Sequence, residues 1–237
     1  MKEHLLENYS ERKFPISLLV LHCSAYGTEE NIKIFNECGV SSHYIIDFNA
    51  ETTRLVKEEN RAFHAGSGFW RGISDDLNSR SIGIEVCHKT LGQSAFPQKQ
   101  IQVLIDLCRE IIDRYNIRPE NIIGHSDLAP ARKADPGHFF PWAQLADSDI
   151  GLWYNLKNAD KINSRNIAEL LAIIGYSTEN VEASSYAFCR RFLPEYVQTQ
   201  ADILHLVDNV LPDDFSFMKE DKFLRTLKSV AYEYNNI

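Results

Sequence analysis

Three side chains that can bind a metal ion stand at the ends of apolar segments or in the loops that follow them. His22 ends the apolar run ISLLVLH, His125 follows the short segment NIIG, and Asp135 lies in the next loop. Imidazole nitrogens and carboxylate oxygens bind Zn²⁺ well, and three protein ligands leave a fourth position for water, as in catalytic zinc sites. Taken singly, each residue also has a structural explanation, because a histidine can simply end a strand and Asp135 can begin an Asp-Pro-Gly turn.

The segments that must position these residues alternate between strand-like and helix-like patterns. Apolar runs of strand length predict strands at residues 16–22, 44–48, 53–56, 81–87 and 121–124. Apolar residues at helical spacing predict a helix over residues 28–38 and a longer helix from Pro97 to Tyr115. The mixture predicts an α/β (α+β) fold, in which a central mixed β-sheet is flanked by helices.

The pattern changes around residues 147–164, where strand-like runs stop and polar connectors begin. Beyond them, apolar residues at helical spacing predict three helices, over residues 164–174, 184–193 and 219–234. We therefore expect two units. An α/β domain, residues 1–155, carries the candidate metal ligands, and a small all-helical domain follows at residues 160–237.

Charge and cysteine content exclude several classes of protein. The chain carries 25 lysine and arginine residues against 33 aspartate and glutamate residues, a net charge of −8, which argues against binding nucleic acid through a broad basic surface. Its apolar runs are shorter than the roughly 20 residues of a membrane-spanning helix. Five cysteines without a C-x-x-C pair are a poor disulfide framework and a poor zinc-thiolate site. We expect no nucleic-acid partner, no transmembrane segment and a monomer.

Five motifs follow one another along the chain: VLHCSA, SSHYIID, FHAGSGFWRG, SIGIEV and GHSDLAPARKADPGHFFPW. In these motifs and their order, residues 16–145 resemble the zinc-dependent N-acetylmuramoyl-L-alanine amidases of the amidase-2 family, which share their fold with peptidoglycan recognition proteins and T7 lysozyme. The resemblance implies a Zn²⁺ cofactor with His22, His125 and Asp135 as its ligands.

The resemblance also implies roles for two further residues. Glu85 matches the acidic residue that acts on the zinc-bound water, and Lys133 matches the basic residue that stabilises the tetrahedral oxyanion. Residue chemistry supports both roles, because an apolar strand raises the pKa of Glu85 toward that of a useful base, and a nearby ammonium stabilises negative charge on oxygen. The alternative for Glu85 is a buried carboxylate paired with a structural arginine.

Other polar and aromatic residues are candidates for substrate binding. We expect Tyr44 and His64 to line the groove. The polar segment GSGFWRGISDDLN predicts a surface loop over a site, in which Trp70 and Arg71 contact sugar or stem peptide. As structural residues these two are a loop anchor and a solvated charge. Arg132 is expected to meet substrate carboxylates or solvent.

We therefore expect an amidase that cleaves the bond between N-acetylmuramic acid, including its 1,6-anhydro form, and L-alanine of the peptidoglycan stem peptide. The alternative is a recognition protein that binds muropeptides or peptidoglycan without cleavage. Such proteins typically lose a zinc ligand, whereas this chain keeps three ligands together with Glu85 and Lys133. A zinc protease is a third interpretation, but the chain lacks H-E-x-x-H.

The sequence allows two interpretations of the C-terminal helices and two of the cellular compartment. The C-terminal helices weakly resemble a peptidoglycan-binding three-helix domain, and the alternative is a plain helical extension that stabilises the catalytic domain. The start, MKEHLLENYSERKF, lacks the apolar core of a signal peptide, which favours the cytoplasm. Resemblance to the larger envelope amidases favours the bacterial cell envelope or periplasm, and this is the compartment that we expect.

Overall fold

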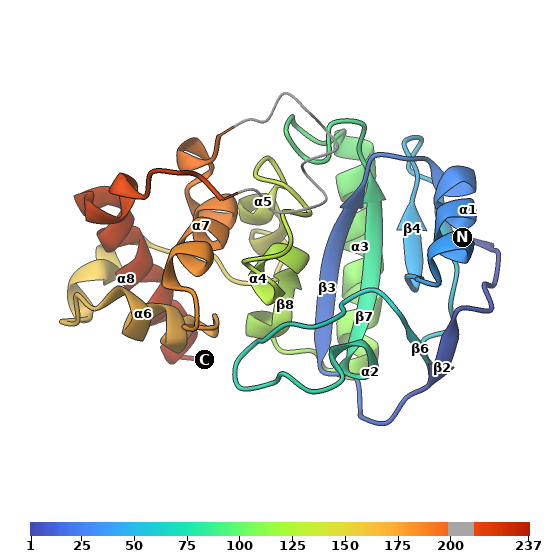
Figure 1. Ribbon diagram of the computed structural model, residues 1–237, viewed down its shortest axis with the longest axis horizontal. Helices are drawn as coiled ribbons and strands as arrows, with labels where there is room; N and C mark the ends of the chain where they lie inside the picture. The colour runs from blue at the N-terminus through green and yellow to red at the C-terminus, as the bar shows by residue number, and fades with distance from the viewer. Residues whose placement is uncertain (199–210) are drawn as a thin grey trace.

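The computed structural model describes residues 1–198 and 211–237, and these residues form a sheet-centred body with a group of helices beside it (Figure 1). Six strands form the main sheet in the order β1-β5-β4-β7-β3-β8. Their bounds are Lys2–Glu3, Thr52–Arg54, Tyr44–Ile46, Ser81–Cys87, Leu18–Ser24 and Ile122–Gly124, in that order. Only the β4–β5 pair among them is antiparallel, so the sheet is mixed, as predicted.

The two central strands are apolar and buried along most of their length. In β3 and β7, a side chain that is not fully buried appears at Ser24 and Glu85 alone. Parallel strands covered on both faces require such continuous apolar runs, which is why the sequence pattern located them. A separate two-stranded sheet pairs β2, Tyr9–Glu11, with β6, Asn60–Ala62.

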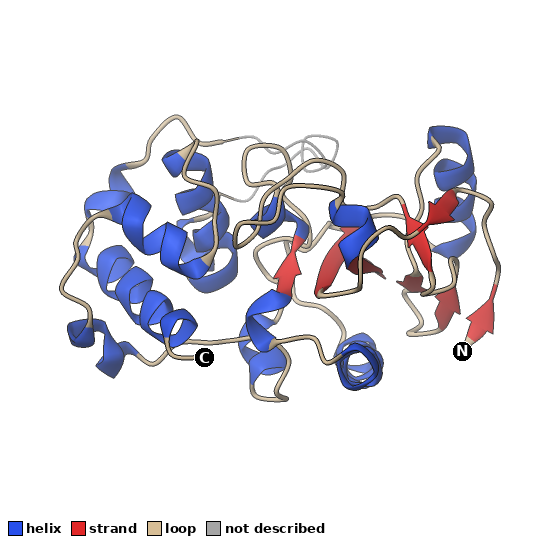
Figure 2. Cartoon of the chain, turned by 90° about the horizontal axis from the view of Figure 1, so that it is seen from below, coloured by secondary structure: helices blue, strands red, loops and turns tan. Residues whose placement is uncertain are grey.

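Two helices cover opposite faces of the sheet. The long helix α3, Gln98–Tyr115, packs its apolar side against Leu19, Leu21, Ile82 and Ile84. On the other face, Phe35 of α1, Thr28–Cys38, packs with Ile45 of β4. Figure 2 shows α3 end-on below the strands and α1 above them. The sheet thus has one face filled by a single helix and one face that leaves room for a site.

Three further helices lie beyond β8, at the end of the molecule opposite the N-terminus (Figure 1). They are α6, Ile167–Ile174, α7, Val181–Phe192, and α8, Asp221–Asn235, close to the predicted bounds. Their apolar side chains share one hydrophobic cluster with residues of β3 and β8. The division of the chain between residues 155 and 160 stays a prediction, and residues 199–210 of that second unit lie outside the described residues.

Short elements complete the described chain. They are the helices α2, Leu77–Arg80, α4, His125–Leu128, and α5, Trp142–Ala146, and the 3₁₀ turns Pro119–Asn121, Leu156–Lys161, Pro194–Tyr196 and Ser216–Lys219.

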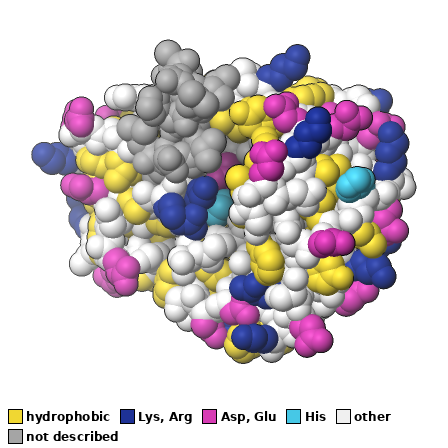
Figure 3. Space-filling model, turned by 45° about the vertical axis from the view of Figure 1, so that its right-hand side comes forward, with side chains coloured by type: hydrophobic (Ala, Val, Ile, Leu, Met, Phe, Trp, Pro, Cys, Tyr) yellow, Lys and Arg dark blue, Asp and Glu magenta, His cyan; other side chains and the backbone are white. Residues whose placement is uncertain are grey.

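Within the described ranges, no helix combines the length and apolar character needed to cross a membrane. On the face that Figure 3 shows, lysine and arginine side chains lie scattered among acidic ones.

Candidate metal centre

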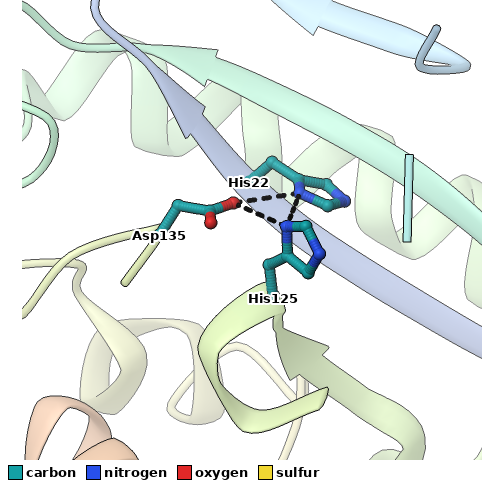
Figure 4. Close-up of side chains that lie close together, drawn as sticks. All are labelled: His22, His125 and Asp135. Carbon is teal, nitrogen blue, oxygen red and sulfur yellow. Dashed lines mark hydrogen bonds and ion pairs between the residues drawn. The ribbon is translucent and has the colours of Figure 1, made fainter. Parts of the chain in front are cut away.

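Three side chains converge beside the C-terminal end of β3 (Figure 4). Because β3 and β8 are parallel and Leu21 pairs with Gly124, the residues that follow this pair, His22 and His125, arrive side by side. The Nδ1 atoms of His22 and His125 lie 3.1 Å apart. The Oδ2 atom of Asp135 lies 3.0 Å from the first and 3.3 Å from the second. The structure therefore brings together the three predicted ligands.

The outer nitrogen of each histidine has its own partner. His125 donates its Nε2–H to the carbonyl of Ala65 at 3.0 Å, which leaves its Nδ1 free to act as a ligand. His22 Nε2 lies 3.0 Å from Nδ1 of His64, whose own Nε2 lies 3.1 Å from the hydroxyl of Ser81.

The hydroxyl of Ser81 settles the direction of this chain of hydrogen bonds. It donates to the carbonyl of Leu77 at 2.6 Å, so its oxygen accepts from His64 Nε2–H. His64 Nδ1 then accepts from His22 Nε2–H, and His22 Nδ1 is left without a proton. Two bare nitrogens and a carboxylate oxygen thus face one another, and a cation satisfies all three.

The protonation states suit metal binding. Burial, reinforced by the nearby His125, lowers the pKa of His22 to about 4. Burial and the neighbouring histidine His22 also hold the pKa of His64 well below its usual value. Burial alone opposes ionisation of Asp135, but interactions with His125 and His22 hold its pKa well below the usual range. Near neutral pH the site therefore offers a neutral imidazole at His22 and an ionised carboxylate at Asp135, which are the forms that metal ions bind.

Two more residues line the pocket that contains these ligands, and both were predicted to act in catalysis. Glu85 of β7 pairs with His22 of β3, so both side chains project from the same face of the sheet. Lys133 comes from the loop that carries Asp135. The pKa of Glu85 is raised to about 8, first by burial and then by Asp135, whereas Lys133 opposes the shift.

The alternative for Glu85, a structural pair with an arginine, finds no support among the described residues. The charged groups that influence its pKa are Asp135 and Lys133, both of the same pocket. The rest of the wall is partly apolar and includes Ala25, Tyr26, Phe35 and Phe63. A raised pKa in a partly apolar pocket is what a general base for neutral pH requires.

Tyr44 does not line the groove, which corrects one prediction. It pairs with Ile84, so its side chain lies on the face of the sheet that packs against α3. There it is buried, and its hydroxyl donates to Glu58 Oε1 at 2.8 Å. Side chains alternate between faces along a strand, so the paired register decides this placement. His64 does line the pocket, where it bonds to a ligand.

The structure also corrects the predicted role of Trp70, whereas contact between Arg71 and substrate stays a prediction. Trp70 is completely buried, so its ring cannot stack on a sugar, and its Nε1–H donates to the carbonyl of Glu120 at 3.0 Å. The guanidinium of Arg71 donates to the carbonyl of Ile174 at 2.9 Å. The loop-anchor alternative is therefore right for Trp70. Arg71 provides a hydrogen-bond donor for a backbone carbonyl at the C-terminal end of α6. Their loop lies against the C-terminal helices instead of covering the metal ligands.

Arg132 lies beside the pocket instead of lining it. Its Nη2 donates to the carbonyls of Ala65 and Ser67 at 3.1 and 2.6 Å, which binds it to the neighbouring loop. Arg132 lines a second pocket, which lies between this loop and residues 177–184. Contact between Arg132 and substrate carboxylates stays a prediction.

Sequence reasoning missed several residues that support the site. Ser81 and Asp127 are buried and hydrogen-bonded around the ligands, and Asp127 also pairs with Arg191 of α7. Asp127 follows His125 by two positions within the last motif, and this proximity was the available signal. Its partner lies 64 residues away, at a distance along the chain that no local pattern bridges.

Comparison with known proteins decides the family. A family model described as N-acetylmuramoyl-L-alanine amidase, amidase-2, matches residues 12–138. The chain belongs to the amidase-2 family. It is 37% identical to the N-acetylmuramoyl-L-alanine amidase AmiD of Escherichia coli (strain K12) over 188 residues, which is 69% of this chain and 68% of AmiD.

Further amidases of the family match to different extents. The 1,6-anhydro-N-acetylmuramyl-L-alanine amidase AmpD of the same strain is 38% identical over 106 residues, 45% of this chain and 56% of AmpD. The solved structure of AmiD from E. coli, described as a complex with the substrate anhydro-N-acetylmuramic acid-L-Ala-D-gamma-Glu-L-Lys, superimposes with a TM-score of 0.74 and 28% identity, covering 98% of this chain and 100% of AmiD. The structure of AMPDH3 from Pseudomonas aeruginosa superimposes with a TM-score of 0.73 and 27% identity, covering 92% of each chain.

These comparisons confirm the predicted fold class and the prediction of an amidase. The AmiD structure covers the C-terminal helices as well as the sheet, because 98% of this chain superimposes on it. A His-His-Asp cluster suited to a metal ion is present among the described residues, in agreement with the family.

Proposed function

We propose that this amidase uses Zn²⁺ to hydrolyse the amide bond between N-acetylmuramic acid, including its 1,6-anhydro form, and L-alanine of the stem peptide. One observation carries the proposal: three electron-donating atoms converge on one point, in the same pocket as a carboxyl of raised pKa and a lysine. The substrate follows from the relatives. AmiD is described with an anhydro-muropeptide as its substrate, and AMPDH3 with an anhydromuramic pentapeptide.

The donor set supports zinc in particular. Two imidazole nitrogens and one carboxylate oxygen, from His22, His125 and Asp135, form a three-ligand set of the kind found in catalytic zinc sites. When bound, Zn²⁺ lowers the pKa of a coordinated water to about 7 and polarises a carbonyl oxygen. The thiol of Cys23 lies in the pocket wall, but burial raises its pKa well above the usual value, so it is a poor fourth ligand.

The residues of the chain then divide the reaction between them. Glu85 takes a proton from the attacking water while the water oxygen bonds to the amide carbon. Lys133 faces the negative charge that develops on the carbonyl oxygen and stabilises it. As the carbon–nitrogen bond breaks, Glu85 returns the proton to the nitrogen of L-alanine, which leaves as a free amine. Its pKa of about 8 suits both transfers near neutral pH.

The deciding experiment is a digestion with and without metal. Purified sacculi and anhydro-muropeptides are incubated with the zinc-loaded chain, the chelated chain and Glu85→Gln, and products are identified by mass spectrometry. We expect free stem peptide from the zinc-loaded chain and from chelated chain resupplied with Zn²⁺. Glu37→Gln, an exposed substitution on α1, is the matched control and should retain activity. Undiminished release by the chelated chain would refute the metal mechanism.

We further propose that the protein works as a monomer on peptidoglycan fragments in the bacterial cell envelope. The similarity to AmiD over about two thirds of both chains, against less than half of this chain for AmpD, supports the larger-amidase subfamily on which this compartment rests. Cell fractionation tests the compartment, and light scattering of the purified chain tests the monomer. Recovery of the protein in the soluble cytoplasmic fraction, or a dimeric mass, would contradict the respective proposal.

A further inference from the structure

A buried carboxylate supports the turn that carries one of the metal ligands. Asp127 lies in α4, two residues after His125, and is 1% exposed. Its Oδ2 accepts from the backbone N–H of Gly124 at 2.9 Å, which closes the turn around His125. The other two donors to Asp127 come from the C-terminal helices and their connection: Arg191 Nη1 at 3.0 Å and the hydroxyl of Tyr176 at 2.5 Å.

Arg191 contacts the chain on both sides of the ligand. Besides Asp127, it donates through Nη2 to the carbonyl of Ile122 at 3.2 Å, three residues before His125. Its guanidinium also lies 4.1 Å from the ring centre of Trp142, which packs beside it. One arginine of α7 thus bonds to the backbone before the metal ligand and to a side chain after it, and the separate donors of the planar guanidinium suit these two contacts.

The second support of His125 is attached to the same helices. Its Nε2–H donates to the carbonyl of Ala65, at the start of the loop that Trp70 anchors. The ring of Trp70 packs edge-on against Tyr176 at 5.2 Å, and the backbone N–H of Arg71 donates to the carbonyl of Gly175 at 2.9 Å. Both the backbone turn and the outer nitrogen of the ligand are therefore connected to the C-terminal helices.

A buried ion pair is weak evidence for stability alone, because removing both charges from water costs as much as their attraction returns. Asp127 and Arg191 are 1% and 2% exposed at their side chains, so their desolvation is nearly complete. Two apolar residues would fill the same space without that cost. The pair therefore makes better sense as a device that sets a geometry, and the geometry it sets is that of the turn at His125.

We propose that Arg191 and Tyr176 are positioning residues, which hold the His125 turn through Asp127 and make the C-terminal helices a supporting wall of the metal centre. This inference rests on the proposed metal site. It favours the helical extension over an independent cell-wall-binding domain, because the helices complete the surroundings of a ligand.

Metal affinity of the full-length chain tests the inference. Apo protein is titrated with Zn²⁺ in competition with a chromophoric chelator, well below the unfolding temperature, for wild type, Tyr176→Phe and Arg191→Met. Tyr176→Phe removes one hydrogen bond to Asp127 and keeps the ring. We expect the dissociation constant to rise about three- to tenfold for Tyr176→Phe and about 10- to 100-fold for Arg191→Met, the range of lost outer-shell partners.

A destabilised control separates positioning from general weakening of the helices. Leu227→Ala opens a cavity in the core of α8 without touching Asp127, so it should lower the melting temperature and leave the zinc dissociation constant within twofold of wild type. Asp127→Asn added to Arg191→Met removes the unpaired buried charge and should restore part of the affinity.

The outcomes are distinct. Wild-type affinity in both Tyr176→Phe and Arg191→Met, or an equal loss in Leu227→Ala, would overturn the inference while the metal centre stands. Should Arg191→Met not fold, Tyr176→Phe decides by the same measurement. Failure of the wild-type chain itself to bind Zn²⁺ would refute the proposed metal centre, and the inference with it.

Discussion

Two acidic side chains withdrawn from solvent, Glu58 and Asp135, show how surroundings separate a structural carboxylate from a metal ligand. Glu58 is surrounded by hydrogen-bond donors: the hydroxyls of Tyr44 and Tyr115 at 2.8 and 2.9 Å, and Arg114 Nη1 at 2.6 Å. Asp135 instead faces two histidine nitrogens.

The difference lies in what each cluster still lacks. Every oxygen of Glu58 has a donor, so that cluster is complete without any further group. At Asp135, His22 already donates its one N–H to His64 and His125 donates its one N–H to the carbonyl of Ala65, so the inner nitrogens can only accept. Acceptor atoms that converge on one point are suited to bind a cation. The number of hydrogen-bond donors around each carboxylate therefore distinguishes the Asp135 cluster from the Glu58 cluster, whereas burial does not.

The largest expected effect comes from removing one ligand of the candidate metal centre. Asp135→Ala should lose stoichiometric zinc and reduce amidase activity at least about 10³-fold, because a ligand and its charge are removed together. Zinc content by atomic absorption and turnover of anhydro-muropeptide check this. Glu58→Gln is the matched control: it should lower stability by about 2 kcal/mol yet keep one zinc per chain, and zinc loss there would contradict the comparison.

Glu85→Gln tests the base without disturbing the ligands. Because Gln cannot accept the proton of the attacking water, we expect turnover to fall about 10²–10⁴-fold while the zinc content stays at one per chain. Steady-state kinetics and metal analysis on the same preparation measure both quantities. Near-native turnover would remove Glu85 from the mechanism.

His64→Ala sharpens the comparison at the outer hydrogen bond of His22. Loss of its acceptor frees the His22 ring to rotate or change tautomer, so zinc should bind about 10–100-fold more weakly. Ser81→Ala, which removes only the next link, should have a smaller effect of the same sign. Chelator competition measures both, and unchanged affinity in His64→Ala would show that the ring is held by packing alone.

The smallest expected effect is on the pH dependence of the metal-free chain. Burial and Asp135 raise the pKa of Glu85 from 4.5 to about 8, so between these values the folded state keeps a proton that the unfolded state has lost. Stability from this group is therefore complete below pH 4.5 and falls as the pH rises through 8. Metal-free Glu85→Gln should be more stable than metal-free wild type by about 2 kcal/mol at pH 6, and by more at pH 8.

Urea unfolding at pH 4 and pH 8 measures this difference. The two proteins should differ little at pH 4, where Glu85 is protonated in both the folded and the unfolded state. An equal difference at both pH values would mean that Gln changes packing rather than removing a costly charge.

Much of the fold could be predicted because the pattern of each element is local. The strands β3 and β7 are buried on both faces, and α3 presents one apolar side, so their residues carry the signal themselves. The three ligands, Glu85 and Lys133 lie in motifs whose family resemblance implied their roles, and the structure brings all five to one pocket.

Predictions failed where a neighbour distant along the chain decides the placement. Tyr44 lies one position from the site-facing row, and the pairing of β4 with β7 turns it toward α3. Trp70 is an aromatic residue in a polar loop, and the C-terminal helices bury it completely. Neither the strand register nor the docking of those helices is visible in the residues around these positions.

The sequence by itself determined which side chains can bind a metal, accept a proton or stabilise a negative charge, because those abilities belong to the residue types and their motifs. Only the tertiary structure decided which carboxylate meets donors and which meets acceptors. Glu58 finds Arg114 and Tyr115 more than 50 residues away, and Asp135 finds His22 at 113 residues. A carboxylate becomes a ligand or a structural anchor through the protons of its neighbours, and folding alone brings those neighbours together.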